Sequence, residues 1–448
     1  MDILEKIFEA GVVGAGGAGF PTHIKLDGVA EYLLVNAVEC EPLLETDKFI
    51  TRHKSEEIIK AMEIMGNHIQ AKEMVIGLKK KNTKEIQALR EAIQCLKSKV
   101  TLHLVENFYP AGDEQMLVYE ITKRQVPPGG IPKDVGVVVC NVGTVVNIYE
   151  ALNEKPVTHK LVTILGEVKN PSMVYAPIGT PIEKCIEMVG GPTIQAYRIV
   201  LGGPMMGRVI EKSQLNQEVV TKTTGGIIVL PEEHFMLRDK QQDLTQMINR
   251  SRSTCIQCSL CTDLCPRNLI GHPLRPHRIM RTLSGDKEQY GVLKEALLCC
   301  ECGVCEVYAC PMGQTPKNIN VEIKNLLRQE GIRYSDTSVK NEVNGMREYR
   351  KVPAERLLAR LELSGYADQV KDGYCSIEPH RVKIPLKQHI GKPATPIVEV
   401  GSLVEKGQLI ARVNAGDLGA NIHASMQGVV SEINEFIWIE AGEKAVIQ

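Results

Sequence analysis

Two cysteine-rich segments decide the fold: CIQCSLCTDLCP at residues 255–266 and CCECGVCEVYACP at residues 299–311. The first has the spacing C-x2-C-x2-C-x3-C-P, and the second repeats it with one more residue before its last cysteine. Runs of this kind hold 4Fe–4S clusters through cysteine thiolates. The eight cysteines of the two runs are Cys255, Cys258, Cys261, Cys265, Cys299, Cys302, Cys305 and Cys310.

The spacing also predicts how the eight thiolates are shared. Three cysteines two residues apart wrap one loop around a cluster, so the fourth ligand must come from elsewhere. In ferredoxins with two clusters, the last cysteine of each run binds the other cluster. We therefore predict two sets of four ligands, Cys255, Cys258, Cys261 and Cys310 for one cluster and Cys265, Cys299, Cys302 and Cys305 for the other. Cys300 fits neither run.

Two other uses of these cysteines fit less well. Disulfides need an oxidising compartment, and fourteen cysteines without a signal peptide favour a reducing cytosol. All-thiolate zinc sites also use C-x2-C pairs, but they usually separate two pairs by a longer loop. Because iron–sulfur clusters carry single electrons, the two runs predict an electron-transfer protein.

The composition limits the remaining classes of function. A chain of 448 residues indicates about three domains, at roughly 150 residues each. The net charge of −1 gives no basic surface for nucleic acid, and 4% aromatic residues give few stacking platforms for single strands. No apolar run is long enough for a transmembrane helix, so we expect a cytoplasmic protein.

Residues 1–150 predict alternating helices and strands. Helical patterns lie at 1–11, 55–69 and 83–99, and apolar strands at 31–38, 73–80, 100–107 and 135–144. Such alternation is typical of an α/β layer structure with a largely parallel sheet.

A glycine-rich loop, GAGGAG at residues 14–19, follows the first helix. Repeated glycines let the backbone approach a phosphate closely, and Lys25 could add a charge. The pattern is not the dinucleotide G-x-G-x-x-G, so a structural turn is an equal alternative. Glu39 and Glu41 follow an apolar strand, where ligands gather in open α/β sheets, although a solvated turn explains them as well.

Three segments together resemble a known family. GAGGAGFPTHIK (14–25), LVNAVECEPLLETDK (34–48) and NVGT (141–144) are similar to the flavin-binding fold of the complex I flavoprotein subunit. They are still more similar to the Rnf complex C subunit and to cobalamin reductases of the PduS type. The resemblance implies FMN in the N-terminal domain, with NADH docking over the flavin.

The same resemblance implies a set of site residues. Gly14, Gly16 and Gly17 would approach the FMN phosphate. The other implied residues line the FMN and nicotinamide site: Gly19, Lys25, Asn36, Glu39, Glu41, Gly112, Asp113, Glu114, Asn141 and Thr144. No general acid or base is expected.

The resemblance extends over the rest of the chain. It implies four domains: an α/β FMN- and NADH-binding domain at 1–155, a β-grasp SLBB domain at 156–235, a helical domain with two 4Fe–4S clusters at 236–370, and a barrel-sandwich hybrid at 371–448. The hairpin tip ASMQG (424–428) lacks lysine, so lipoylation and biotinylation are not expected. The barrel-sandwich module comes last, which favours the PduS arrangement over that of the Rnf protein.

The implied function is an oxidoreductase that passes electrons from NADH through FMN and two 4Fe–4S clusters to cobalamin, in the metabolism of 1,2-propanediol-type bacterial microcompartments. The alternatives are the C subunit of an Rnf-type ion-translocating complex and an electron relay without NADH activity. The implied partners are NADH, cobalamin or another acceptor, an adenosyltransferase and microcompartment shell proteins. The lumen of a microcompartment is the implied location within the cytoplasm.

Overall fold

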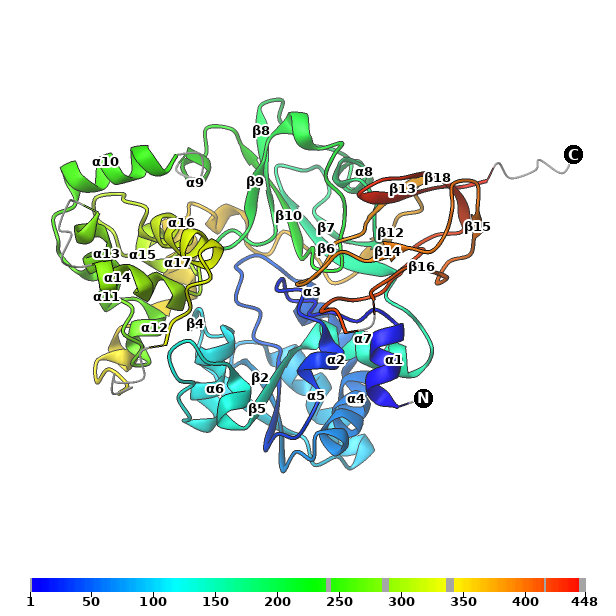
Figure 1. Ribbon diagram of the computed structural model, residues 1–448, viewed down its shortest axis with the longest axis horizontal. Coiled ribbons are helices and arrows are strands. Elements are labelled where there is room, and N and C mark those ends of the chain that lie inside the picture. Colours follow the sequence, from blue (N-terminus) through cyan, green and yellow to red (C-terminus); the bar gives the residue numbers. More distant parts are fainter. Residues whose placement is uncertain (1, 239–242, 284–289, 336–341, 415, 443–448) are drawn as a thin grey trace, which may run out of the picture.

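The computed structural model describes residues 2–238, 243–283, 290–335, 342–414 and 416–442. Four parts surround a common centre: an α/β part at the N-terminus, a second sheet, a helical part and a small β part at the C-terminus (Figure 1). Within the described ranges no helix has the length and apolar character needed to cross a bilayer.

The N-terminal part is built on a parallel sheet of four strands in the order β3-β2-β1-β5. Alternate residues of β1 face opposite sides: Leu33 and Val35 share a core with α4 and α7, and Leu34 shares one with α6. This confirms the predicted parallel α/β arrangement. The elements are α1 Ile3–Glu9, α2 Thr22–Lys25, β1 Tyr32–Asn36, α3 Thr46–His53, α4 Ser55–His68, β2 Glu73–Lys79, α5 Thr83–Leu96, β3 Thr101–Val105, β4 Phe108–Tyr109, α6 Glu114–Thr122, β5 Val137–Asn141 and α7 Val142–Leu152.

The second sheet has six strands in the order β12-β7-β6-β10-β8-β9. Helix α8 packs its buried side chains against this sheet. Its edge strand β12 comes from far along the chain and pairs in parallel with β7. The elements are β6 His159–Gly166, β7 Ser172–Pro177, α8 Ile182–Met188, β8 Tyr197–Leu201, β9 Arg208–Ile210, β10 Gly226–Pro231 and β12 Tyr374–Ser376.

The helical part carries both cysteine loops, and their backbones repeat. Gln257 and Ser259 in the first loop and Glu301 and Gly303 in the second all have left-handed φ, at equivalent positions. Each loop then enters a short helix, α11 or α15. The helices are α9 Phe235–Arg238, α10 Leu244–Thr254, α11 Leu260–Asp263, α12 Pro266–Leu269, α13 Pro276–Thr282, α14 Tyr290–Leu293, α15 Val304–Val307, α16 Pro316–Gln329 and α17 Ala354–Arg360, and β11 Val352–Pro353 pairs with β4.

The C-terminal part packs two small sheets against the N-terminal part, and one hydrophobic core runs through both. Lys222 lies at this junction, fully buried, and its Nζ donates to the carbonyl oxygens of Gly11 and Asn421, each at 2.7 Å. The strands are β13 Arg381–Pro385, β14 Thr395–Pro396, β15 Leu403–Val404, β16 Leu409–Arg412, β17 Ile422–His423, β18 Gly428–Ile433 and β19 Phe436–Glu440.

Candidate active site and cluster sites

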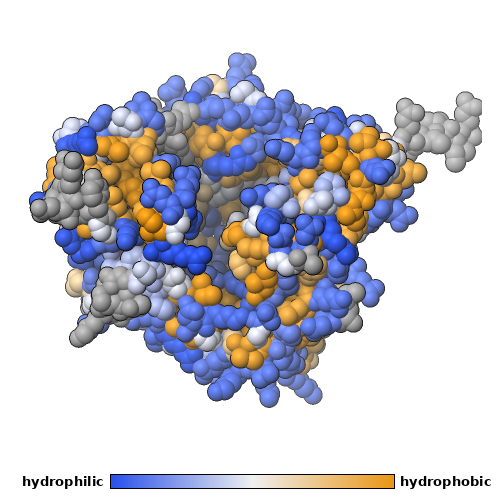
Figure 2. Space-filling model, viewed as in Figure 1, coloured by the Kyte–Doolittle hydropathy of each residue, from blue (hydrophilic) through white to orange (hydrophobic). Residues whose placement is uncertain are grey.

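A cavity of about 750 Å³ lies between the N-terminal part, the second sheet and the helical part. Figure 2 shows the surface hollowed near the centre of the molecule, where these parts meet. All predicted flavin-site residues except Gly19 line this cavity. A Cβ on Gly19 would instead meet Thr223 and the backbone of Gln388 and His389, so this glycine allows close packing behind the loop.

The glycine loop supplies free backbone donors to the cavity. The amide of Ala15 donates to Thr144 Oγ1 at 2.8 Å, which fixes the loop to the first turn of α7. In the described part of the chain, no acceptor is found for the amides of Gly16, Gly17 and Ala18, and all three residues line the cavity. Consecutive free amides of this kind form a concave site for an anion. The loop therefore fits a phosphate group.

Two asparagines mark the carboxyl ends of neighbouring strands, β1 and β5, where Asn36 lies opposite Asn141. Asn141 caps α7 by accepting from the amides of Gly143 and Thr144, and its Nδ2 donates to Asp47 at 2.6 Å. Asn36 Nδ2 donates to the carbonyl oxygen of Gly112 at 2.8 Å. Both side chains therefore hold the walls of the cavity in place.

The acidic residues of the cavity differ in their surroundings. Burial raises the pKa of Glu39 well above its usual value, and the nearby Asp47 raises it further. Glu41 instead accepts hydrogen bonds from the amides of Met205 and Met206, at 2.9 and 3.0 Å. Glu41 therefore ties the loop after β8 to the cavity.

Lys25 lies in the cavity but already has a partner, since its Nζ contacts Glu114 Oε1 at 2.7 Å. Burial works to lower the pKa of Lys25, but Glu114 and Cys140 outweigh it, so the net shift is upward. The ammonium of Lys25 therefore keeps its positive charge, which the carboxylate of Glu114 partly offsets. A phosphate bound here would share Lys25 with Glu114.

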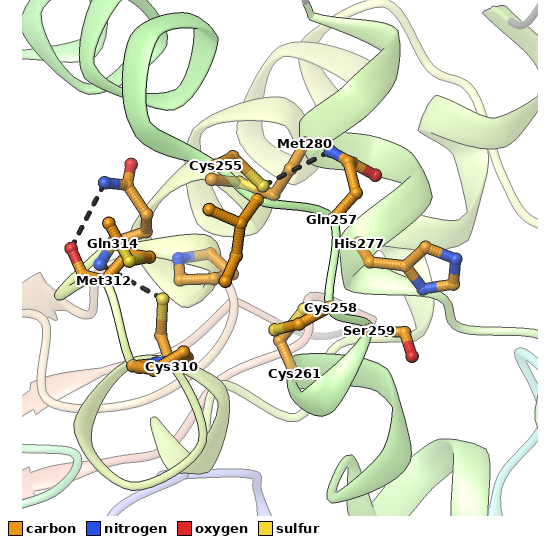
Figure 3. Close-up of a pocket in the computed structure, with 13 residues that line it drawn as sticks. Cys255, Gln257, Cys258, Ser259, Cys261, His277, Met280, Cys310, Met312 and Gln314 are labelled. Carbon is orange, nitrogen blue, oxygen red and sulfur yellow. Dashed lines mark hydrogen bonds between the residues drawn. The ribbon is translucent and has the colours of Figure 1, made fainter.

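The outer cysteine site is a separate pocket in the helical part. Cys255, Cys258, Cys261 and Cys310 surround this pocket (Figure 3). Gln257 Nε2 donates to Cys255 Sγ at 3.2 Å, and the amide of Gln314 donates to Cys310 Sγ at 3.3 Å. Burial raises the pKa of the Cys261 thiol to about 12, and the three other cysteines of the pocket contribute. These are the four thiols predicted for one cluster.

The inner cysteine site is formed by buried thiols next to the 750 Å³ cavity. Cys265, Cys302 and Cys305 are each less than one-tenth exposed, and Cys302 also lines the cavity. Burial raises the pKa of Cys305 well above its usual value, and Cys299 and Cys265 are close enough to raise it further. The amide of Glu301 donates to Cys299 Sγ at 3.4 Å. The other four predicted ligands are therefore neighbours.

The spacing of the thiols suits clusters better than single ions. Among the described residues, no three Cys, His, Asp or Glu side chains lie close enough to hold one metal ion. Zinc binds thiolates at about 2.3 Å, so its sulfurs lie within about 4 Å of one another. A 4Fe–4S cluster carries its four cysteine sulfurs on the outside of a larger body, and these sulfurs commonly accept hydrogen bonds. The observed pockets and donors fit that group.

Four residues of this region had no role in the sequence analysis. Lys160 on β6 lies half-buried in the cavity wall, and its Nζ donates to the carbonyl oxygen of Ala15 at 2.8 Å. Asp47 lies beside it, and burial raises the pKa of Asp47. Cys300, outside both runs, lines the cavity, and Arg267 lies near it. Asp47 and Cys300 lie inside the quoted segments and Arg267 directly follows the first cysteine run, but only the packing of distant segments brings the four residues to this region.

Two histidines lie near the cysteine sites, His272 and His277. Each has one ring nitrogen in contact with a protein oxygen. His272 is buried and its Nε2 contacts the carbonyl oxygen of Val126 at 2.9 Å, and burial lowers its pKa to about 4. His277 lies at the outer pocket with Nδ1 at 2.7 Å from Thr262 Oγ1. Both contacts agree with a structural role.

Four family models match the chain in the predicted order. They are the Nuo51 FMN-binding domain at residues 7–150, the SLBB domain at 161–209, a 4Fe–4S dicluster domain at 254–314 and the RnfC barrel-sandwich hybrid domain at 375–447. These matches confirm the predicted fold class and the FMN and 4Fe–4S cofactors.

The curated relatives include two named groups. The cobalamin reductase PduS of Salmonella typhimurium is 41% identical over 436 residues, which cover 97% of this chain and 95% of that protein. The C subunit of the ion-translocating oxidoreductase complex of Vibrio cholerae is 34% identical over 61% of this chain and 34% of its own length. Among solved structures, an NAD+-reducing NiFe hydrogenase chain is 18% identical, with a TM-score of 0.48 over 75% of this chain and 63% of its own.

Proposed function

Because this chain belongs to the family of the cobalamin reductase PduS, we propose that it transfers electrons from NADH, through FMN and two 4Fe–4S clusters, to cobalamin. Bound FMN accepts a hydride and gives up its two electrons singly, which suits clusters that each take one electron. The protein's own contribution is to bind these groups, to orient them and to set the charge around them.

One observation carries the proposal: a single cavity extends from the glycine loop to the inner cysteine site. Gly16 and Gly17 line one end, and Cys302 lines another part of the same wall. Tyr109 joins the two regions, because its hydroxyl donates to the carbonyl oxygen of Cys302 at 2.8 Å. A flavin held by the loop would therefore lie beside the inner thiols, with the outer thiols farther along.

We assign the residues as follows. The amides of Gly16, Gly17 and Ala18 hold the FMN phosphate, and Lys25 supports it as a charge shared with Glu114. Asn36, Asn141 and Thr144 shape the cavity wall, and Gly112, Asp113 and Glu114 form the loop opposite. The inner cluster takes Cys265, Cys299, Cys302 and Cys305, and the outer cluster takes Cys255, Cys258, Cys261 and Cys310.

The test uses anaerobically purified full-length protein loaded with FMN and iron. NADH should bleach the flavin absorbance at once and then reduce added hydroxocobalamin, followed at the visible bands of the corrin. Flavin that stays oxidised would overturn the proposed enzymatic activity and leave an electron relay. Rapid bleaching without cobalamin reduction would retain the NADH reaction and reject cobalamin as the acceptor.

A second candidate function is that of the C subunit in an ion-translocating complex. The match to the Vibrio cholerae protein favours it, although that match spans only 34% of the relative. Co-expression with the membrane proteins of such a complex separates the two candidates. Pelleting of this chain with the membrane fraction would favour the complex, and recovery in the supernatant would favour the cobalamin reductase.

The partners and location of the reductase are also proposals. An adenosyltransferase is the natural consumer of reduced cobalamin, because it must capture the reduced corrin before it reoxidises. We propose that the two proteins work together inside a bacterial microcompartment, in contact with shell proteins. Co-purification of this chain with intact shells, and its loss from broken ones, tests the location.

A further inference from the structure

Arg267 occupies a position between the inner cysteine site and the flavin cavity. It follows Cys265 by two residues, on the short helix α12. Its side chain is 8% exposed, and Nη2 donates to Asp113 Oδ2 at 2.9 Å. Nε and Nη1 are buried without an oxygen or nitrogen acceptor among the described residues, and the Cys300 thiol lies within hydrogen-bonding reach of the guanidinium. The guanidinium is therefore a buried cation held between Asp113 and Cys300.

Asp113 compensates this cation only in part. Its Oδ1 accepts from the amides of Gln115 and Met116, each at 3.1 Å, at the N-terminus of α6. That helix has nine residues, so the positive end of its dipole shares the carboxylate charge with Arg267. The pair therefore leaves residual positive charge where it faces the thiols.

Asp113, which pairs with Arg267, lines the same cavity as Cys300 and Cys302, so Cys302 of the inner site lies near this cation. Burial works to lower the pKa of Arg267, but Asp113 first, and then Cys300 and Cys302, raise it above its usual value. Cys302 is one of the predicted ligands, and Cys300 lies between it and Cys299. Arginine keeps its charge at every working pH, so this cation is fixed.

We propose that Arg267 is the positioning residue that sets the reduction potential of the inner cluster. The carboxylate of Asp113 partly offsets the positive charge of Arg267. Reduction adds one electron, hence one negative charge, to the cluster. A fixed cation in a water-poor site stabilises the reduced form, because the attraction is weakly screened there. Arg267 thus raises the reduction potential of the inner cluster, next to the cavity where electrons would enter. This inference rests on the proposed cluster assignment.

The experiment measures both cluster potentials by redox titration followed by electron paramagnetic resonance. Arg267→Gln should shift the midpoint of one cluster to a more negative value, and Arg267→Lys should restore most of it. Asp113→Asn keeps the helix cap, since asparagine caps equally well, and should shift the same midpoint to a more positive value. The midpoint of the other cluster should move less in every variant.

Arg347→Gln is the matched control, because Arg347 is also a buried arginine in an ion pair, with Glu120 of α6. It should shift neither midpoint. Unchanged midpoints in Arg267→Gln and Asp113→Asn, or shifts of the same sign in both, would overturn the inference. If Arg267→Gln loses the inner cluster, the midpoints of that cluster in Arg267→Lys and Asp113→Asn test the inference instead. Wild-type protein without two cluster signals would instead overturn the proposed function.

Discussion

The two cysteine loops have nearly the same spacing and the same backbone turns, but they lie in opposite environments. Around the outer site Ile256, Leu260 and Met312 are 60%, 41% and 39% exposed, and Cys258 is exposed as well. At the inner site Cys265, Cys302 and Cys305 are buried, and the Tyr109 hydroxyl donates to the carbonyl oxygen of Cys302. The repeat therefore specifies how each loop holds sulfur, whereas its surroundings decide what each cluster exchanges electrons with.

The largest expected difference comes from deleting one ligand at each site. Cys302→Ala and Cys258→Ala should each lose up to about half of the iron, one cluster of two. Cys302→Ala should also stop NADH from reducing the remaining cluster, because the site beside the cavity is gone. Cys258→Ala should leave flavin reduction and one NADH-reducible cluster intact, while reduction of the acceptor falls to background.

Iron analysis and electron paramagnetic resonance after NADH addition measure both variants. Equal behaviour of the two variants would show that the outer and inner sites are not in series. Full iron content in either variant would refute the ligand assignment.

The second-largest expected difference is in how easily each site loses its iron. A chelator under mildly oxidising conditions should take about half of the iron first, from the exposed outer site, since buried ligands are reached only when the protein opens. The cluster that remains should still be reduced by NADH. Loss of the NADH-reducible signal before the other one would reverse the assignment of outer and inner.

Lys222, which lies outside the cysteine sites, tests how far burial lowers the pKa of a lysine in this protein. Burial lowers the pKa of Lys222 from 10.5 to about 7. Between these values the unfolded chain binds more protons than the folded one, so Lys222 makes stability rise with pH over pH 7 to 10.5. Below about pH 7 this contribution no longer changes with pH.

Lys222→Met should abolish that slope, which amounts to at most about 1.4 kcal/mol per pH unit. Denaturant unfolding at several values between about pH 7 and 9.5 measures it against wild type. Parallel stability curves for the two proteins would contradict the lowered pKa. Lys222→Met should also lower the free energy of unfolding by an amount that does not vary with pH, because the carbonyl groups of Gly11 and Asn421 lose their donor.

The smallest expected effect concerns the matched turn positions of the two loops. Gly303→Ala places a Cβ at φ +76° and 3.3 Å from Met205 Cε, so it should destabilise the holoprotein by about 1–2 kcal/mol. Ser259→Gly relieves the left-handed conformation at the equivalent outer position, and should change stability by less than about 1 kcal/mol. Thermal unfolding measures the stability of both variants. If Ser259→Gly lost as much stability as Gly303→Ala, the left-handed turns of the two loops would not be equivalent.

Much of the cluster chemistry could be read from local spacing. Eight cysteines in two runs predict the thiol sets, because a C-x2-C-x2-C loop has few ways to fold around one cluster. The glycine loop alone left a phosphate site and a structural turn open. The free amides of Gly16 and Gly17 favour the phosphate site, and Gly19 is placed outside the cavity.

Other features could not be read from the sequence, because they depend on residues far apart in the chain. Arg267 meets Asp113 across 154 residues, and Glu41 meets Met205 across 164. Lys160 reaches the glycine loop from β6, in the second sheet. Periodicity and spacing describe neighbours along the chain, and these contacts join elements from three parts of the molecule.

The sequence by itself predicted two sets of four thiols, the parallel α/β layer and the order of the four parts. These properties follow from short-range geometry, in which a few residues fix a loop or a strand. Only the tertiary structure decided which cysteine site lies beside the central cavity and which faces solvent. Burial and charge at a site are set by every segment packed around it, and no local pattern contains that information.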